Sequence, residues 1–241
     1  MKKIIAVALG MLFVYTTNAQ VKTFVAAVTA NEKIYAEGFN DKTLELFNFV
    51  GDKFSMADES MKVKNYVFND LAKELPFTVL SEDVVLSNST FNAYVTERKS
   101  GITGSIGRTA VENYLSFVPV KKDNLQELID IFKEEGANSV MSIDMNYCVS
   151  AKTLIAGNGT AVAKIQVTIV LRDYNNKDLM TVTASGYSKG TLKVVANQIV
   201  SGKDNLPEYM QEASADLFKE MKEKLPKAIA KFEKKLAKYS K

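Results

Sequence analysis

The chain has 241 residues, of which 46% are hydrophobic and 24% are charged, and its formal net charge at pH 7 is +3. This length and composition suffice to bury the core of one domain. The chain contains no histidine and a single cysteine, Cys148. These counts exclude Ser-His-Asp and Cys-His catalysis, histidine-based or thiolate-cluster metal sites and an internal disulfide, and the small net charge does not indicate nucleic-acid binding.

The first residues have the pattern of a secretory signal peptide. Two lysines precede an apolar run over residues 4–15, and the small residues Thr17 and Ala19 suit the −3 and −1 positions of a signal peptidase site. The run is shorter than the about twenty residues that span a bilayer, so a retained anchor is the weaker interpretation. We expect a periplasmic or secreted chain that begins at Gln20, with a net charge of +1 because two lysines leave with the signal. Cys148 lies far from the cleavage point, so a lipoprotein is not expected.

The stretch after the signal contains one ambiguous and one clear segment. Residues 21–40 follow neither a helical nor a strand period and receive no assignment. Residues 44–50 (LELFNFV) form a short apolar run that is closed by Gly51 and Asp52. This pattern predicts a buried strand.

A helix is predicted to begin at Ser55 and to end before Pro76, which cannot continue it. Asp58 stands three residues after Ser55 in a capping-box-like relation. The apolar positions of this helix recur every four residues and are Val63, Val67, Leu71 and Leu75. Residues 77–80 (FTVL) are rich in β-branched and aromatic side chains, which predicts a strand directly after the helix.

Residues 89–117 surround Gly101, Gly104 and Gly107; we leave their structure open, and two short strands around the glycines are one arrangement that we consider. The apolar residues that alternate are Phe91, Ala93 and Val95 on the first arm and Val111, Leu115 and Phe117 on the second. The glycine spacing matches neither a dinucleotide fingerprint nor a P-loop, so a mobile loop or hairpin tip is favoured over an anion site. Charged residues crowd the ends of both arms: Arg98, Lys99, Arg108 and Glu112. We therefore favour a soluble excursion over a membrane-spanning hairpin.

A second helix and a strand are predicted in the middle of the chain. Residues 124–135 place apolar side chains on one helical face, with Asp123 as the expected N-cap and Gly136 as the C-terminal cap. Residues 140–147 alternate between apolar and polar, which predicts a half-buried strand. Cys148 continues this apolar stretch, and we interpret it as a small buried side chain rather than a reactive thiol.

The strongest local pattern is a β-hairpin. Apolar and polar residues alternate over residues 163–171 and again over residues 180–185, on either side of a pair of asparagines. The turn imitates the start of a calcium loop at Asp173. However, Asp178 occupies the glycine position and Ala184 the twelfth, so a turn without metal is favoured.

A long helical region is predicted from about residue 206 to residue 239. Its apolar residues form one stripe: Met210, Ala213, Leu217, Met221, Leu225, Ile229, Phe232 and Leu236. Pro226 should kink or divide the helix. The lysines beside the stripe are Lys222, Lys224, Lys227, Lys231, Lys234, Lys235 and Lys238. They are most simply a solvated face; contact with a membrane surface or an anionic partner is the alternative, which the interspersed Glu220, Glu223 and Glu233 weaken.

Three motifs fit a known family pattern. They are Phe77, Val79 and Leu80; then Gly136, Ala137 and Asn138; and then Val167, Ile169, Leu171, Asp173, Ala184, Ser185 and Gly186. With these motifs, residues 44–188 resemble the α/β domain shared by CsgG-like curli-secretion proteins and the N-terminal domain of TolB-like proteins. The resemblance implies an envelope protein that binds other proteins and sometimes oligomerises. The chain departs from the secretion-pore members because it lacks a lipidated cysteine and lipid-facing hairpins.

We therefore predict a signal peptide at residues 1–19 and a single α/β domain over residues 20–241, with a family-like core at 44–188 and a helical region at 206–239. One mixed sheet should carry an antiparallel C-terminal hairpin, packed helices and a long C-terminal helix. No catalytic, cofactor-binding or metal-binding residue is expected. The leading function is a soluble, non-enzymatic periplasmic protein that binds another envelope protein or itself, without nucleic acid and without a membrane span after signal cleavage.

Two other functional classes stay open. One is a carrier of a small apolar or anionic ligand, held between the sheet and the C-terminal helix. The other, which we rank lowest, is a carboxylate-based hydrolase, for which a cleft with two facing acidic side chains is the discriminating observation.

Overall fold

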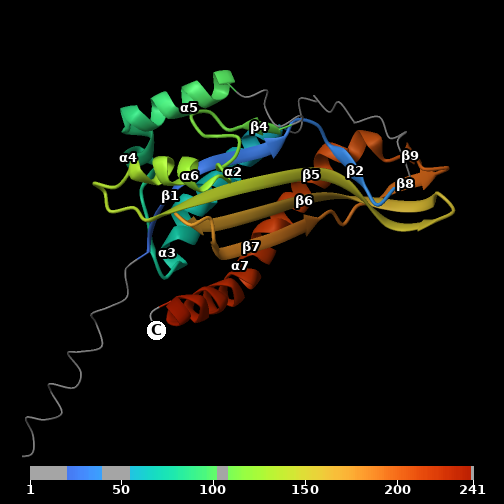
Figure 1. Cartoon of the computed structure of the whole chain (residues 1–241). Coiled ribbons are helices and arrows are strands. Elements are labelled where there is room, and N and C mark those ends of the chain that lie inside the picture. The colour runs from blue at the N-terminus through green and yellow to red at the C-terminus, as the bar shows by residue number, and fades with distance from the viewer. Residues whose placement is uncertain (1–20, 40–54, 102–107, 240–241) are drawn as a thin grey trace, which may run out of the picture.

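The structure is a computed structural model that describes residues 21–39, 55–101 and 108–239. Three predicted features lie outside the described residues: the signal peptide at 1–19, the strand at 44–50, and the glycines Gly104 and Gly107 of the glycine-rich segment. The described residues form one mixed sheet with helices packed on it and a long C-terminal helix, as the sequence predicts (Figure 1).

The centre of the sheet combines parallel and antiparallel pairs. β1 (Lys22–Asn31) runs parallel to β3 (Thr78–Val79) on one side and to β5 (Ser139–Ile155) on the other. β6 (Asn158–Asp173) and β7 (Asp178–Tyr187) follow as successive antiparallel neighbours. The predicted strands at 77–80 and 140–147 and the predicted hairpin are therefore confirmed.

Four short strands extend this sheet. β2 (Tyr35–Glu37) continues the line of β1 and pairs with β5, and β4 (Arg108–Ala110) pairs with the end of β1. β8 (Leu192–Val195) and β9 (Gln198–Ser201) form a second hairpin that joins β6 near its start. The β5–β6 and β8–β9 turns touch, since Asn197 N–H donates to the Gly157 carbonyl at 2.7 Å.

β1 is the strand that the sequence left unassigned. Nine of its ten residues are buried, including the polar Thr23, Thr29 and Asn31. A strand buried on both faces has no alternation of apolar and polar residues, so it lacks the period-two signal. The side-chain amide of Asn31 is hydrogen-bonded to β5. Its Oδ1 accepts from Tyr147 N–H at 2.7 Å, and its Nδ2 donates to the Tyr147 backbone carbonyl at 2.8 Å.

The helix predicted from Ser55 is present, with an irregular second half. The Ser55 hydroxyl accepts from Asp58 N–H at 3.1 Å, and α2 (Met56–Tyr66) continues through a π-helical turn into the short α3 (Ala72–Glu74). The chain leaves this helix before Pro76 and enters β3. α2 and its continuation bury Val63, Val67, Leu71 and Leu75 against the sheet.

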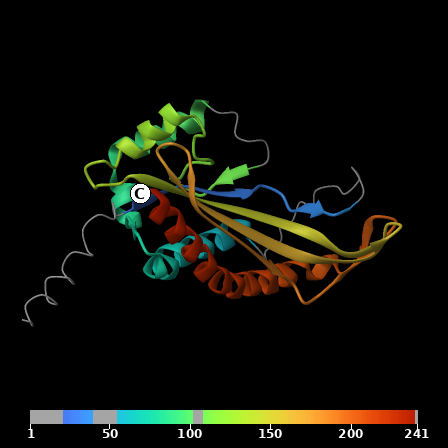
Figure 2. The same ribbon diagram turned by 60° about the horizontal axis from the view of Figure 1, so that its bottom comes forward.

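Three helices cover the other face of the sheet beside β1. They are α4 (Glu82–Ser87), α5 (Ser89–Gly101) and α6 (Lys122–Asp130). Their apolar side chains enclose Phe24 of β1, whose ring lies 4.2 Å from the ring of Phe132, centroid to centroid. Figures 1 and 2 show this layer on the opposite side of the sheet from α2 and the C-terminal helix.

Two local interpretations of the sequence do not match the structure. Residues 89–101 form α5 rather than a strand, because Phe91, Tyr94 and Val95 share one buried helical face while Ala93 is exposed. Only the second arm contributes a strand, the three-residue β4. The caps of α6 differ from the prediction: Lys121 instead of Asp123 holds the N-cap position, and Ile131 instead of Gly136 holds the C-cap position, because the helix ends at Asp130. Gly136 ends the turns that follow the helix and has a positive φ of 78°.

The helix α7 (Leu206–Tyr239) covers the second face of the sheet and confirms the predicted stripe. Its buried residues include Met210, Leu217, Met221, Leu225 and Phe232. The helix is not divided at Pro226. The lysines predicted to be solvated are exposed wherever their side chains are described: Lys222, Lys224, Lys227, Lys231, Lys234 and Lys235.

One side of α7 also closes the edge of β7. Ser185 N–H donates to Glu220 at 2.6 Å, Tyr187 N–H donates to Asp216 at 3.0 Å, and the N–H groups of residues 189 and 190 donate to Glu212. The three carboxylates stand four residues apart on the helix. Along the other chain segment they accept from the N–H groups of every second residue, 185, 187 and 189, the last of which lies just beyond the end of β7. Helix and strand approach closely at Gly186, where a Cβ atom would lie 1.9 Å from the Ala213 carbonyl oxygen.

The turn between β6 and β7 is a polar turn, as predicted. The Asp173 carboxylate accepts from the N–H groups of Asn175 and Lys177 at 2.8 and 2.9 Å, and Asn176 has a positive φ of 60°. The carboxylate that opened the apparent calcium loop is therefore used to hold the turn.

Candidate functional site

A groove of about 660 Å³ opens beside the start of α2. It lies between the first two turns of α2, the ends of β1 and β4, and α4. The lining residues come from four separated stretches of the chain: 30–32, 56–64, 82–86 and 109–113. Its volume falls within the range of about 300 to 1,000 Å³ that is typical of ligand pockets.

The walls of the groove are largely apolar. Met56 and Met61 come from α2, Leu86 from α4 and Val111 from the segment after β4, with small alanine side chains between them. Met61 is 39% exposed although it is a large apolar residue. Methionine side chains are flexible and adapt to partners of different shape, so this wall is suited to binding.

The polar part of the groove contains a partly buried ion pair. Lys64, on α2, forms an ion pair with Glu82 at the start of α4, and the Tyr114 hydroxyl donates to the same carboxylate at 3.0 Å. Burial raises the pKa of Tyr114 far above its usual range, and the negative charge of Glu82 adds to this effect. Tyr114 therefore acts here only as a neutral donor.

A second hydrogen-bonded pair joins the groove to the sheet. The Ser60 hydroxyl lies 3.1 Å from the Tyr147 hydroxyl, and Ser60 also donates to the Met56 carbonyl at 2.7 Å. Burial raises the pKa of Tyr147 above its usual range. These contacts fix the position of α2 above β5.

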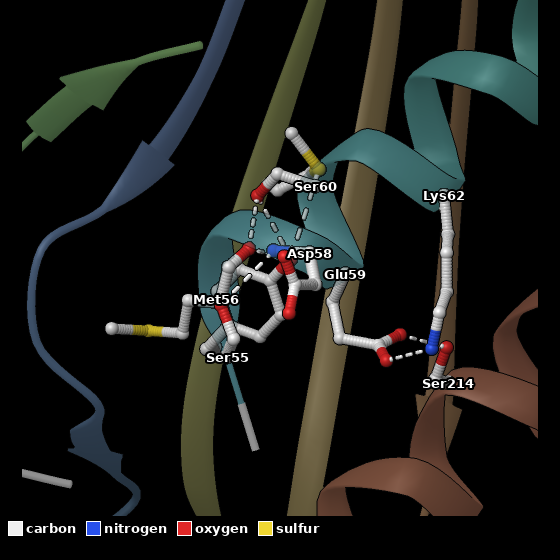
Figure 3. Close-up of polar contacts among 9 residues, drawn as sticks. Ser55, Met56, Asp58, Glu59, Ser60, Lys62 and Ser214 are labelled. Atoms are coloured by element: carbon white, nitrogen blue, oxygen red, sulfur yellow. Dashed lines mark hydrogen bonds and ion pairs between the residues drawn. The ribbon is translucent and has the colours of Figure 1, made fainter. Parts of the chain in front are cut away.

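Glu59 uses the other side of the same helix to join α2 to α7 (Figure 3). Its carboxylate accepts from the Ser214 hydroxyl at 2.6 Å and forms an ion pair with Lys62. Glu59 and Ser214 are both buried. The contacts of Glu59 lie behind the groove wall, so we assign this carboxylate a structural role.

The charges at the groove are predominantly negative. Three glutamates, Glu32, Glu82 and Glu112, and one lysine, Lys64, line it. Because Lys64 and Glu82 neutralise each other, the exposed Glu32 and Glu112 dominate the electrostatic character of the rim. This arrangement favours an apolar group that carries a positive charge and disfavours an anion.

The sheet face opposite α7 provides a second surface, which the α4–α6 layer covers only beside β1. Over β6 and β7 this face presents polar residues such as Thr168 and Thr183, whose hydroxyls lie 3.3 Å apart. Lys164 forms an ion pair with Glu37 at 2.7 Å on the same face. Thus the predicted polar face of the hairpin is present, but many of its charges are already paired within the chain.

Cys148 is buried, as predicted. Burial, with a contribution from the nearby Glu37 carboxylate, raises the pKa of its thiol to about 12. A thiol in this environment stays protonated at neutral pH and is a poor nucleophile.

The acidic side chains that line the groove are Glu32, Glu82 and Glu112. Of these, Glu82 faces Lys64 and Tyr114 rather than a second carboxylate. Among the described residues, no group of three or more Asp, Glu or Cys side chains is placed to hold a metal ion. No helix in residues 21–39, 55–101 and 108–239, including the 34-residue α7, is long and apolar enough to cross a bilayer.

The described residues define an α/β protein with a mixed sheet, helices on both of its faces and a groove beside α2. No family model matches the chain. The families without a match include the CsgG-like and TolB-like families, which its motifs resemble. No curated protein matches it either.

Among the solved structures that are similar to this chain, three have the following low TM-scores. The lipoprotein GNA1162 from Neisseria meningitidis has a TM-score of 0.34 and 14% identity, over 83% of this chain and 99% of that one. The C-terminal domain of LpoB from Salmonella enterica gives 0.27 and 10%, over 75% and 92%. The hypothetical protein CT253 from Chlamydia trachomatis gives 0.33 and 10%, over 87% and 97%. At these TM-scores, no conclusion about this chain follows from the similarity.

The sequence did not indicate the groove. The polar residues that line it have the sequence pattern of ordinary helix-surface or turn residues, and only the fold brings them together from distant positions: Ser60, Lys64, Glu82 and Glu112. The only sequence signal is the pair of methionines, Met56 and Met61, near the start of the helix that follows Ser55.

Proposed function

We propose that this chain is an exported, non-enzymatic protein of the cell envelope that binds another protein through the groove beside α2. The signal-like start supports export, and the absence of histidine, together with a buried Cys148, supports a role without covalent catalysis. The observation that carries the proposal is the groove itself, with its methionine wall and its excess of carboxylates.

The chemistry of the groove defines the segment that would fit it. Met56, Met61 and Leu86 would take up a large apolar side chain, and Glu32 and Glu112 would attract a neighbouring lysine or arginine. A partner segment that combines an apolar residue with a basic one satisfies both parts. Charge complementarity of this kind sets specificity and association rate more than affinity.

The test blocks the groove without touching the core. Ala57 is exposed on α2 and lines the groove, so Ala57→Trp fills it with a large ring. Ala93→Trp places the same ring on an exposed position of α5 and is the matched control. Proteins captured from envelope extracts by the chain from Gln20 should be lost with Ala57→Trp and retained with Ala93→Trp. Capture of the same proteins by both variants would rule out the groove as the binding site.

Self-association is a distinguishable form of the same proposal. Sedimentation of the purified chain over a range of concentrations would reveal it, and Ala57→Trp should then shift the equilibrium to monomer. A truncation before Leu206 is not a suitable probe, because α7 supplies part of the core.

The groove also supports a second candidate function, a carrier of a small molecule. The space between the sheet and α7, where the sequence suggested a ligand, is filled by core side chains such as Leu217 and Met221. The groove offers a volume of the right size, and its excess of carboxylates favours an apolar ligand with a cationic group over an anionic one. Native mass spectrometry of protein purified from its source would show a retained small molecule if the carrier function holds.

A further inference from the structure

The two touching hairpin turns form an exposed apolar end of the molecule. Ile155, at the end of β5, is 77% exposed; Val195, at the end of β8, is 41% exposed; and Val200, on β9, is 54% exposed. We call these three residues the tip patch. Figures 1 and 2 both show the β5–β6 and β8–β9 turns at the end of the sheet away from α4, α6 and the C-terminus.

The tip patch is held in place by backbone geometry. Ala156, Gly157, Ala196 and Asn197 all have positive φ, between 50° and 78°, so both turns are of the tight type that suits the twist of paired strands. In addition to the bond from Asn197 to Gly157, Ala196 N–H donates to the Asn158 side chain at 3.1 Å. The two turns therefore present their apolar residues as one preformed unit.

The charges within the two described stretches that form the tip patch have one sign. The charged residues within 150–163 and 189–203 are Lys152, Lys189, Lys193 and Lys203, and all four are exposed. Neither stretch contains a carboxylate, although Asp204 follows directly after the second. Lys193 stands two residues before Val195 on β8, so both side chains lie on the same outer face of the hairpin.

Exposed aliphatic residues surrounded by lysines match a membrane surface that contains anionic lipids. Aliphatic side chains enter the boundary between headgroups and acyl chains, while lysine ammonium groups remain among the anionic headgroups. α7 lacks this combination, because its apolar stripe faces the sheet and glutamates interrupt its lysines.

We propose that the tip patch is a contact site for an anionic lipid surface, and that it docks this protein reversibly with the sheet pointing away from the membrane. The proposal does not depend on the groove or on its partner. It also moves the membrane contact suggested by the sequence from the C-terminal helix to the opposite end of the molecule. Three aliphatic residues and four lysines give a weak attachment, which salt should reverse.

The test is co-sedimentation with lipid vesicles of the chain from Gln20, which contains every described residue. It should bind vesicles of phosphatidylglycerol mixed with phosphatidylcholine and should not bind phosphatidylcholine alone. Ile155→Asp should weaken binding by about tenfold or more, because it removes an exposed aliphatic side chain that would enter the lipid boundary and adds a charge that the anionic headgroups repel. Val120→Asp is the matched control, since Val120 is 66% exposed but lies in the segment between β4 and α6.

Charge reversal gives an independent test. The double variant Lys152→Glu and Lys193→Glu alters only exposed positions and should abolish binding to the anionic vesicles. Retained binding in either tip variant, equal loss with Val120→Asp, or no binding of the unchanged chain would overturn the proposal. Thermal unfolding followed by circular dichroism identifies any variant that has lost its fold.

Discussion

Replacement of Gly186 by alanine probes the closest approach between the sheet and α7. The added Cβ would lie 1.9 Å from the Ala213 carbonyl oxygen, 2.3 Å from the Leu217 nitrogen and 2.8 Å from the Leu217 Cα. All three atoms belong to the helix backbone, so no side-chain rotation can relieve the overlap. Strand and helix must separate by about 1 to 2 Å to restore normal contact distances.

The energetic cost has two parts. Overpacking of this kind destabilises proteins by about 1 to 3 kcal/mol. The separation also stretches the bonds from Ser185 to Glu220 and from Tyr187 to Asp216, and hydrogen bonds to a charged group contribute about 1.5 to 3 kcal/mol each when intact. With partial loss of these bonds, we expect Gly186→Ala to lower the free energy of unfolding by about 2 to 5 kcal/mol.

Urea unfolding followed by circular dichroism measures this change. Gly136→Ala is the control, because the nearest atom to its added Cβ is Lys22 Cδ at 3.8 Å, but its φ of 78° is unfavourable for alanine. That variant should lose only about 1 to 2 kcal/mol from backbone strain. The packing argument is refuted if Gly186→Ala is as stable as the unchanged protein, or gains the about 0.4 to 1 kcal/mol that alanine gives at an unhindered glycine position.

Three further predictions concern buried polar groups. Because burial raises the pKa of the Cys148 thiol to about 12, the folded protein should not react with a maleimide at neutral pH, and the urea-unfolded protein should; equal rates would contradict the burial. Glu59→Ala should lower the free energy of unfolding by about 1 to 3 kcal/mol, since it leaves the buried Ser214 hydroxyl without its acceptor, whereas Glu59→Gln should cost less; a fully stable alanine variant would disprove the role of this bond. The hydrogen bond from the Lys164 ammonium lowers the pKa of Glu37. The stabilisation by the charged Glu37 carboxylate is therefore present at neutral pH and is lost as the pH falls through the acid range. Glu37→Gln should reduce the dependence of the free energy of unfolding on pH in this range, and an unchanged pH profile would count against this linkage.

The elements that could be predicted from the sequence are those with one buried and one solvated face. The hairpin of β6 and β7 and the stripe of α7 both meet water on one side, so their periods of 2 and 3.6 are visible in the residue pattern. The predicted bounds of 206 and 239 for α7 match the structure. Its neighbour α2 was recognised from the serine cap and the proline stop, which are local signals.

The elements that could not be predicted depend on contacts between distant residues. β1 is an inner strand enclosed by two layers, so its sequence carries no period. In α5, Phe91 and Val95 fit both an alternating strand and a helix, and only the packing of Phe91 against Phe132 on α6's continuation decides between them. The groove joins four separated stretches, and no local pattern reports its shape or its charge.

The closure of β7 by α7 has a consequence for how these molecules can associate. An edge strand with unpaired N–H and C=O groups can pair with the same strand of another molecule, and repeated pairing of this kind leads to aggregation. Here Glu212, Asp216 and Glu220 accept hydrogen bonds from the backbone N–H groups that another strand would need along the second half of that edge. Pairing of two molecules through this part of the sheet edge is therefore blocked even at high local concentration, and a long-lived assembly must use a different part of the surface.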